Sequence, residues 1–519
     1  MTKNTFLIGL AILLVGCKEK STSTQKIVEA ETVGLVSSFS EPYRPQFHFT
    51  PPQKWMNDPN GLLFENGVYH LYYQHYPEDI VWGPMHWGHA TSKDMIHWKH
   101  QPIALYPDSL GLIFSGSAVW DKKNTSGFGT SETPPMVAIY TYHLMEGEQT
   151  GRMDFQTQGI AYSLDHGLQW EKYNRNPVIK NEGIKDFRDP KVFWDDTTSQ
   201  WILALVAGDH VKFYRSPNLK DWKLLSTFGE NKGSHGGVWE CPDLFSLTVE
   251  NTEEEKWVLL VSINPGGPNG GSATQYFVGD FDGEKFTTSQ KEPKWIDYGM
   301  DNYAGVTYNN APNNERLFIG WMSNWNYARD TPTEVWRSAM TLPRLISLHK
   351  DEDGYYIKNY PHPNFDAICS AKEMVTTIDL SEPFLMEAES FMQTDFSFQA
   401  DLSKSLEVRF GNASEEIVFW VDPSVGKLYF DRTKSGQVDF EKSFGSQIQS
   451  QPYRPSESLS EVRFVIDQSS VEIFIAGGKY VFTNQLFPTQ PYTQLSITGE
   501  QQSLMNVVYR DVNSIWNEQ

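Results

Sequence analysis

The stretch Ala161-Tyr162-Ser163-Leu164-Asp165-His166-Gly167-Leu168-Gln169-Trp170 shows the unit that decides the fold of this chain. It begins like a β-strand with small and aromatic residues, continues with a polar turn that contains glycine, and ends on an aromatic residue able to plug the next strand. The same features recur in Ala90–Asp94 before Trp98, Phe213–Pro217 before Trp222, and Val278–Gly283 before Phe286. The chain therefore repeats one short β unit over much of its length.

Successive units lie roughly 50 to 70 residues apart, which is the size of a four-stranded propeller blade. From residue 44 to about 350, this period predicts about five blades. From about residue 365 the pattern changes to alternation of apolar and polar residues, as in Leu406–Phe410, Val462–Phe464 and Val471–Ile475, and Gly477-Gly478 predicts a hairpin turn. Such alternation is typical of an antiparallel sandwich.

The expected fold is therefore all-β, a five-bladed β-propeller followed by a C-terminal β-sandwich. The expected boundaries are the propeller at 44–350, a linker at 351–364 and the sandwich at 365–519.

Composition restricts the partners of the chain. Its 519 residues carry 43 Lys and Arg against 65 Asp and Glu, a net charge of −22. This charge would repel a nucleic acid, so we expect no nucleic-acid role and favour a neutral substrate. The three cysteines, Cys17, Cys241 and Cys369, are too few for a disulfide framework.

The N-terminus has the pattern of an export signal. Phe6–Gly16 is an apolar run too short to span a bilayer, and Leu14-Val15-Gly16-Cys17 resembles a bacterial lipobox, whose cysteine is lipidated after cleavage. An ordinary signal peptide that contains a cysteine is the alternative. We expect a signal peptide at 1–17, a flexible tether at 18–43, and an exported protein that a lipid on Cys17 anchors to a bacterial membrane, in the periplasm or at the cell surface.

Three carboxylates lie in settings rich in Gly, Pro and aromatic residues. Asp58 follows Trp55-Met56-Asn57, Asp189 follows Phe187-Arg188, and Glu240 lies in the apolar stretch Val238–Phe245. Each has a simpler interpretation: an Asx turn for Asp58, a surface ion pair for Asp189 and a buried structural pair for Glu240. Together they are more informative, because a propeller brings distant inner strands to one axis and glycoside hydrolysis needs two carboxylates.

These motifs resemble those of glycoside hydrolase family 32, the invertases, inulinases and levanases. Trp55–Gly61, Phe114–Ser117, Arg188–Pro190 and Glu240–Pro242 match its signatures in order, and Val465–Asp467 with Ser469–Phe474 is similar to its sandwich motif. The resemblance covers about residues 44 to 515 and implies the propeller and sandwich expected above. It also implies a retaining reaction with Asp58 as nucleophile, Glu240 as acid/base and Asp189 as transition-state stabiliser, with Asp58 and Glu240 about 5–5.5 Å apart.

The resemblance further implies substrate contacts. Asn57, Gln74 and Ser115 would bind sugar hydroxyls, and Arg188 would orient its neighbouring acid and the sugar. Aromatic contacts are expected from Trp55 and Trp82, from Phe114 in the second signature, and at the rim from Trp325. For a single tryptophan in a propeller, a core position is the usual alternative.

Ser262–Gly267 and Trp336–Met340 are more similar to the exo-fructanase and yeast-invertase branch than to the phosphosucrose hydrolases, so we expect exo-hydrolysis of levan or inulin, and of sucrose. An endo-fructanase, a fructosyltransferase or a non-catalytic fructan-binding lipoprotein is the alternative. A sialidase is disfavoured, because Ser163–Trp170 is one structural Asp-box turn and no arginine cluster accompanies it.

No cofactor or metal is expected. His86 and His89 are three residues apart on a strand and so point to opposite faces, and Gly266–Gly271 lacks the features of a phosphate loop. The sequence leaves the linkage preference and the oligomeric state open.

Overall fold

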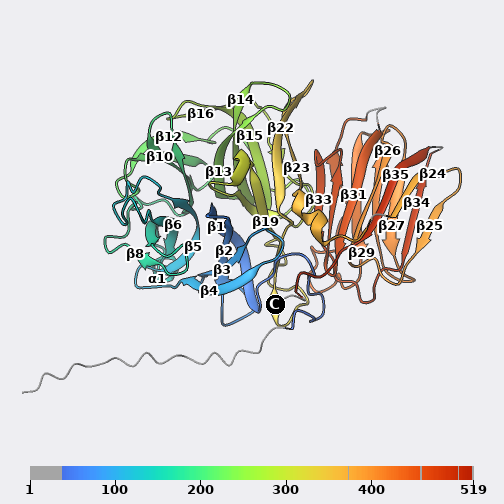
Figure 1. Ribbon diagram of the computed structural model, residues 1–519, viewed down its shortest axis with the longest axis horizontal. Coiled ribbons are helices and arrows are strands. Elements are labelled where there is room, and N and C mark those ends of the chain that lie inside the picture. Colours follow the sequence, from blue (N-terminus) through green and yellow to red (C-terminus); the bar gives the residue numbers. More distant parts are fainter. Residues whose placement is uncertain (1–37, 372, 456–458, 501, 517–519) are drawn as a thin grey trace, which may run out of the picture. The chain divides into compact units, whose positions relative to one another are not determined.

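The computed structural model describes residues 38–371, 373–455, 459–500 and 502–516, so the predicted signal peptide and Cys17 lie outside the described residues. The described part is almost entirely β, as expected (Figure 1). Its helical segments are short: α1 (Met145–Gln149), η1 (Pro312–Asn314) and η2 (Pro363–Ile368). Among these residues no helix is long and apolar enough to cross a membrane.

Strands between residues 54 and 361 form the propeller-like N-terminal domain. The first sheet has the order β20-β1-β2-β3-β4: Trp336–Arg337, Lys54–Glu65, Val68–Tyr76, His86–Ser92 and Lys99–Leu105. The next has the order β5-β6-β7-β8: Leu112–Trp120, Met136–His143, Gln156–Ser163 and Glu171–Lys172. It is followed by β9 (Phe187–Asp195), β10 (Gln200–Ala207), β11 (Val211–Ser216) and β12 (Lys223–Phe228), paired in that order.

The remaining sheets of this domain follow the same antiparallel plan. One contains β13 (Val238–Thr248), β14 (Glu255–Asn264), β15 (Ala273–Phe281), β16 (Phe286–Thr287) and β17 (Lys294–Trp295). The last contains β18 (Tyr303–Thr307), β19 (Leu317–Met322), β21 (Ala339–Met340), β22 (Arg344–Asp351) and β23 (Gly354–Pro361). The number of blades stays a prediction.

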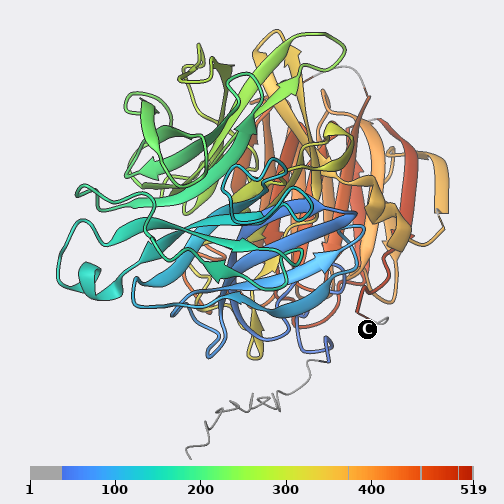
Figure 2. The same cartoon turned by 60° about the vertical axis from the view of Figure 1, so that its left-hand side comes forward.

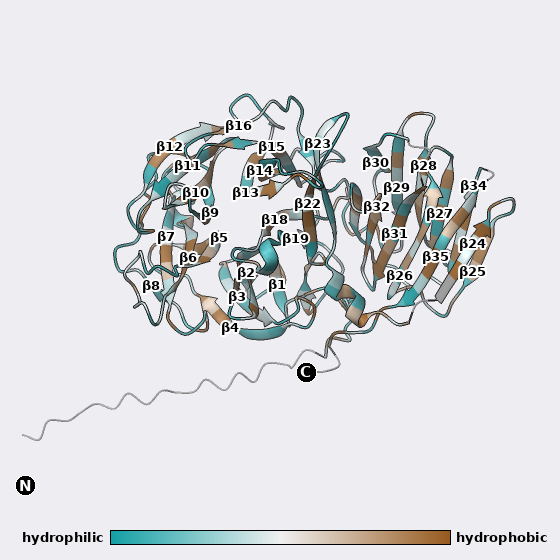
Figure 3. Cartoon of the chain, turned by 45° about the horizontal axis from the view of Figure 1, so that its top comes forward, coloured by the Kyte–Doolittle hydropathy of each residue, from teal (hydrophilic) through white to brown (hydrophobic). Residues whose placement is uncertain are grey.

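The first strand of each sheet lies at the centre of the domain. Strands β1, β5, β9, β13 and β18 surround one axis (Figure 3), and each contacts the next, with β18 returning to β1. Figure 2 shows the sheets of this domain from another side, coloured from blue to yellow along the sequence. Strand β20, from the end of the domain's sequence, also pairs with the first strand, β1. The two strands run parallel, with the pairs Lys54↔Trp336 and Trp55↔Arg337. Residues far apart in the sequence therefore meet along this axis.

The repeated turn seen in the sequence closes the third strand of successive sheets. Ser92 ends β3, Ser163 ends β7 and Ser216 ends β11, and each serine oxygen accepts a backbone N–H of the following turn at 2.8–3.2 Å. The tryptophans that follow donate back to the turn, Trp170 to Gly167 O at 3.1 Å and Trp222 to Leu219 O at 3.0 Å. The repeat is thus a structural device that fixes the strand ends.

The predicted linker at 351–364 differs from the structure. Residues 354–361 form β23, which pairs with β22 along its whole length after a tight turn at Gly354, where φ is +97°. Tyr355, Tyr356 and Ile357 supply the strand-forming residues that the expectation overlooked. The chain leaves the propeller-like domain only after Pro361.

The C-terminal domain is a sandwich of two antiparallel sheets. One has the order β24-β35-β26-β31-β32-β33: Glu373–Asp379, Ser503–Asp511, Thr394–Asp401, Leu459–Asp467, Ser470–Ile475 and Tyr480–Gln485. The other has the order β25-β34-β27-β28-β29-β30: Phe384–Glu387, Gln494–Gly499, Leu406–Gly411, Glu416–Asp422, Lys427–Lys434 and Gln449–Pro452. Apolar residues alternate along these strands (Figure 3) and form one core that includes Phe410, Phe464 and Ile473. The predicted turn at Gly477-Gly478 joins β32 to β33.

Buried charges lie where the sandwich strand β32 contacts the propeller-like domain. Glu472 accepts from Arg344 at 2.7 Å and lies 2.8 Å from His48, whose other ring nitrogen is 2.8 Å from Asp467. Burial alone would raise the pKa of Glu472, but Arg344 and His48 lower it to about 2. The motif Val465–Phe474 thus supplies the two acids, Asp467 and Glu472, that pair with groups of the first domain.

Candidate active site

The three predicted catalytic acids lie at or next to irregular points of the inner strands. The pairing register shifts at Asn57-Asp58 in β1, Phe114-Ser115 in β5, Asp189-Pro190 in β9, Cys241-Pro242 in β13 and Ala304-Gly305 in β18. Such bulges turn side chains that would otherwise alternate between the faces of a sheet. Proline is tolerated there because the extra residue needs no ladder hydrogen bond.

Backbone strain accompanies these bulges. Asp189, Cys241 and Ala304 have φ values of +66°, +46° and +52°, a region that residues with a Cβ rarely adopt. The surrounding sheets hold this conformation, which lies at one of the predicted acids, Asp189, and directly after another, Glu240.

Cys241 connects two of the carboxylates. Its thiol lies 3.8 Å from Oδ2 of Asp58 and 3.6 Å from Oδ2 of Asp189, and its backbone N–H donates to the same Asp189 oxygen at 3.0 Å. Burial and the neighbouring carboxylates raise the pKa of Cys241 well above its usual value, so it is present as a neutral thiol. Asp58 and Asp189 therefore share one small, weakly donating neighbour.

A chain of hydrogen bonds orients Asp58. Ser115 donates to Oδ2 at 2.7 Å and Asn57 donates to Oδ1 at 3.0 Å, while the indole N–H of Trp55 donates to Asn57 at 2.7 Å. Burial and the charge of Glu240 raise the pKa of Asp58 to about 6, against the lowering effect of Ser115 and Asn57. Asp58 is thus ionised at neutral pH but easily protonated below it.

Glu240 has a different partner on each oxygen. Arg188 donates to Oε1 through Nε at 3.2 Å and Nη2 at 3.0 Å, and its Nη1 donates to Asp186 at 2.6 Å. The hydroxyl of Tyr303 donates to Oε2, and burial raises the pKa of this phenol well above its usual value. Since a hydroxyl can also accept, Tyr303 can stay bonded to Glu240 whether or not the carboxyl carries a proton.

Asp189 is the most enclosed acid of the site, with 5% of its surface exposed. Its backbone N–H donates to Thr141 Oγ1 at 2.9 Å, which fixes the strained turn. Burial raises its pKa to about 7, with Glu240 and Asp58 adding to the rise and Arg188 opposing it. Burial and mutual repulsion thus raise the pKa values of both Asp58 and Asp189.

Several predicted sugar-binding side chains are already engaged with the protein. Asn57 and Ser115 bond Asp58, and Gln74, 2% exposed, donates to Ile113 O at 3.0 Å. Trp55 has 0% exposure and presents no ring face for a sugar, which differs from the expected stacking role. In this structure Trp55 instead supports the orientation of Asn57, and through it that of Asp58.

The other predicted aromatic residues are partly exposed. Trp82 and Phe114 meet edge to face with ring centroids 6.0 Å apart, and Trp325 stacks on the buried Trp55 at 6.0 Å. The Arg329 guanidinium lies 6.0 Å from the Trp82 ring and 5.9 Å from the Trp325 ring. Trp82 and Trp325 thus flank one exposed cation beside the core that holds Trp55.

The sequence did not predict roles for Tyr303, Thr141, Asp186 and Arg329, or the contact of Cys241 with two acids. For Tyr303 the sequence does contain a signal. Tyr303-Ala304-Gly305 lies near the start of its inner strand, as Glu240-Cys241-Pro242 does in another, and in both a polar residue precedes a bulge of small residues. Thr141 lies in a middle strand and carries no comparable signal.

His86 and His89, considered as a metal pair, diverge: His86 is near the surface, 2.9 Å from Pro84 O, and His89 is buried beside His70.

Among the described residues, no group of three or more His, Cys, Asp or Glu side chains has an arrangement that could hold a metal ion.

Comparison with known proteins agrees with this geometry. Residues 48–361 match the model of the glycosyl hydrolases family 32 N-terminal domain, and residues 369–512 match that of the family 32 C-terminal domain. A levanase of Bacillus subtilis is 45% identical over 464 residues, which are 87% of this chain and 67% of the levanase.

Two solved structures are similar over most of this chain. The exo-inulinase of Aspergillus awamori has a TM-score of 0.84 and 35% identity, covering 92% of this chain and 100% of that one. The β-fructofuranosidase of Schwanniomyces occidentalis, complexed with fructosyl-erythritol, has a TM-score of 0.83 and 32% identity, covering 92% and 99%. The chain described here belongs to glycosyl hydrolase family 32.

Proposed function

We propose that this glycoside hydrolase is a retaining, exo-acting β-fructofuranosidase, which releases terminal fructosyl units from levan or inulin and also cleaves sucrose. The observation that carries the proposal is the meeting of Asp58, Asp189 and Glu240 around Cys241, from three different inner strands. Two carboxylates are what a retaining glycosidase needs, one as nucleophile and one as acid and then base.

In the first step a carboxylate oxygen of Asp58 attacks C2 of the fructosyl unit. The bond from C2 to the leaving oxygen breaks, and the proton of Glu240 passes to that oxygen. Ser115 and Asn57 hold the Asp58 carboxylate, which restricts its rotation before the attack. In the second step water attacks C2, Glu240 accepts its proton, and the ester bond to Asp58 breaks to release fructose.

Asp189 is the proposed stabiliser of the transition state. Its carboxylate is fixed by the Cys241 N–H and is buried beside Arg188, so it can accept hydroxyl hydrogen bonds from the ring with little reorganisation. Arg188 orients Glu240 through two bonds to one oxygen. This leaves Oε2, the oxygen bonded to Tyr303, as the position from which the proton leaves.

The exo mode and the fructan substrate rest on likeness to an exo-inulinase and a levanase over most of the chain. Partly exposed Trp82, Phe114 and Trp325 support the proposal, because aromatic faces pack on the apolar faces of sugars.

Azide rescue tests the assignment of both acids. Glu240→Ala should lose most of its activity on sucrose, because the leaving oxygen receives no proton. On an aryl β-fructofuranoside, whose leaving group needs no proton, this variant should still form the ester on Asp58, and added azide should speed turnover and give a β-fructosyl azide, since azide attacks the ester without needing a base. In Asp58→Ala, azide should instead attack C2 directly and give the inverted α-fructosyl azide. An α-fructosyl azide from Glu240→Ala, or a β-fructosyl azide from Asp58→Ala, would contradict the assignment.

We further propose export and lipid anchoring through Cys17. Leu14-Val15-Gly16-Cys17 after the apolar run Phe6–Gly16 supports this proposal. The wild-type protein expressed in a bacterium should incorporate radioactive palmitate and partition into detergent, and Cys17→Ser should do neither. Palmitate incorporation that persists in Cys17→Ser would contradict the anchor.

A further inference from the structure

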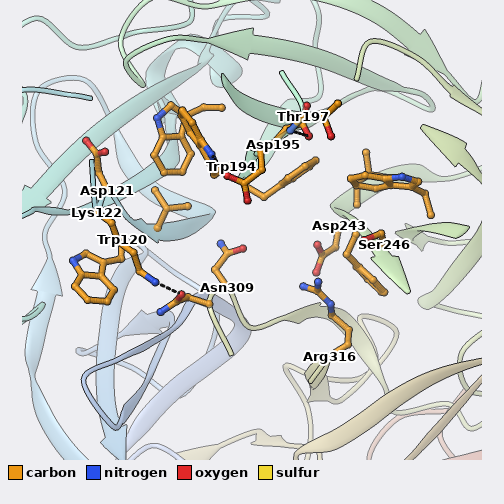
Figure 4. A pocket seen from close by; sticks show the side chains of 18 of the residues that line it. Trp120, Asp121, Lys122, Trp194, Asp195, Thr197, Asp243, Ser246, Asn309 and Arg316 are labelled. Atoms are coloured by element: carbon orange, nitrogen blue, oxygen red, sulfur yellow. Dashed lines mark hydrogen bonds between the residues drawn. The ribbon is translucent and has the colours of Figure 1, made fainter. Parts of the chain in front are cut away.

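One cavity of the propeller-like domain lies away from the carboxylates. It has a volume of about 700 Å³ and is lined by the C-terminal ends of β5, β9 and β13, including Trp120, Trp194 and Asp243 (Figure 4). Ser115, Asp189 and Glu240 lie near the starts of the same strands. The separation is three residues from Glu240 to Asp243 and five from Ser115 to Trp120, which at about 3.3 Å per residue is roughly 10–17 Å along the propeller axis.

Two buried polar atoms beside this cavity have no hydrogen-bond partner among the described residues. Oδ1 of Asp243 is an unpartnered acceptor on a side chain with 0% exposure, and Nε of Arg316 is an unpartnered donor. The other oxygen of Asp243 is fully engaged, by Thr307 at 2.6 and 2.8 Å and by Lys191 at 3.1 Å. Leaving such atoms without partners costs free energy, so a group that reaches them would be stabilised.

An acceptor and a donor at one place favour a hydroxyl-bearing ligand. A hydroxyl donates and accepts at once, whereas an anion only accepts and an ammonium only donates. Five acids, Asp121, Asp195, Asp196, Asp243 and Glu255, line the cavity against three bases, Lys122, Lys123 and Arg316. This excess of negative charge disfavours an anion, so a neutral ligand is the better match to the acceptor and the donor.

The walls add aromatic surface. Trp120, Trp194 and Trp257 are partly buried and line the cavity, and Lys122 and Lys123 lie over the first two rings at 4.7 and 4.4 Å. Lys122 also reaches across to Asn310 at 2.8 Å (Figure 4). Aromatic faces beside amide, ammonium and carboxylate groups match a sugar, which has apolar faces and a polar hydroxyl edge.

We propose that this cavity is a second carbohydrate-binding site, which takes a segment of the same fructan that the active site shortens. The identity of the sugar rests on the proposed function, whereas the preference for a neutral polyol rests on the cavity alone. Its volume lies within the range of about 300–1,000 Å³ that ligand sites occupy. Holding the polymer here raises the local concentration of chain ends at the carboxylates, without any part in the chemical step.

The test uses the full chain and compares a polymer with a short substrate. Trp120→Ala and Trp194→Ala should raise KM for levan about fivefold or more, since removing an aromatic anchor costs over about 1 kcal/mol. The same variants should keep the wild-type kcat and KM for sucrose, which is too short to reach both sites. Trp222→Ala, a half-buried tryptophan of the same domain outside both sites, is the matched control and should change neither substrate. Thermal melting checks that each variant is folded.

Binding is measured separately from turnover. Native electrophoresis in gels that contain levan, inulin or dextran, with excess fructose to occupy the active site, should show retardation of Asp58→Asn by a fructan. Adding Trp120→Ala should abolish that retardation. If no fructan is hydrolysed but another neutral polysaccharide retards the protein through Trp120, the second site stands and the proposed function falls. Equal retardation with and without Trp120, or unchanged KM for levan in both variants, would overturn the second site.

Discussion

Asp58→Asn should abolish turnover and at the same time stabilise the protein at neutral pH. The pKa of Asp58 is raised from 3.8 to about 6 by burial and by Glu240, so the fold favours the protonated carboxyl. Above pH 6 the folded protein must hold an ionised group that it disfavours by about 2 pKa units, or about 3 kcal/mol. The neutral amide removes this cost.

The asparagine can also keep the local hydrogen bonds. Its oxygen can accept from Asn57, and its amide group can donate to Ser115, whose hydroxyl can turn to accept. The gain in the free energy of unfolding should therefore come only from the removal of the negative charge. It should be about 3 kcal/mol at pH 7.5 and about 1 kcal/mol at pH 4.5, because near the unfolded pKa both states are already partly protonated.

Urea unfolding of the wild type and Asp58→Asn at these two pH values measures the difference. Asp280→Asn is the control, because Asp280 is 69% exposed and its single ion pair with Lys256 should contribute less than about 1 kcal/mol at either pH. Destabilisation of Asp58→Asn at pH 7.5, or a gain that does not depend on pH, would refute the view that its carboxylate is held at a cost in stability.

Further predictions concern the pH profile, Tyr303 and the domain contact. The kcat/KM for sucrose should fall as pH drops through about 6, because Asp58 must be ionised to attack; a profile flat from pH 7 to 4 would contradict this. Tyr303→Phe removes the bond to Oε2 of Glu240 and should lower kcat about tenfold with little change in KM, and it should move the alkaline limb of the profile; an unmoved limb would leave Tyr303 a merely structural role. Glu472→Gln leaves Arg344 and His48 without their shared carboxylate and should cost about 3–5 kcal/mol of stability, seen as a lower melting temperature with unchanged kcat per folded molecule; an unchanged melting temperature would show that the buried pairs contribute little.

Much of the fold follows from local chemistry in the sequence. The serine turns at Ser92, Ser163 and Ser216 are set by side chains that bond their own backbone, so their repetition is visible in the sequence. The three acids stand out in the sequence because each lies in a setting rich in Gly, Pro and aromatic residues. The place where those acids meet is set by the ring of inner strands. The sequence repeat indicates that such a ring forms, but it does not give the position of each strand within it.

The parts that were missed depend on contacts between distant strands. Thr141 supports Asp189 from a neighbouring strand, and no local pattern around it reports that contact. Trp55 was expected at a sugar face because its motif position suggested it, whereas packing against Trp321 and Trp325 buries it completely. The expected linker at 351–364 included the strand at 354–361, which is held by its pairing with the preceding strand β22.

The most direct test of the central claim is chromatography of the products that the protein without residues 1–17 releases from levan, inulin and sucrose. The account predicts fructose as the only early product from levan or inulin, glucose and fructose from sucrose, and no product with Asp58→Asn. Early oligosaccharides would contradict exo action, and products from Asp58→Asn at the wild-type rate would contradict the assigned nucleophile.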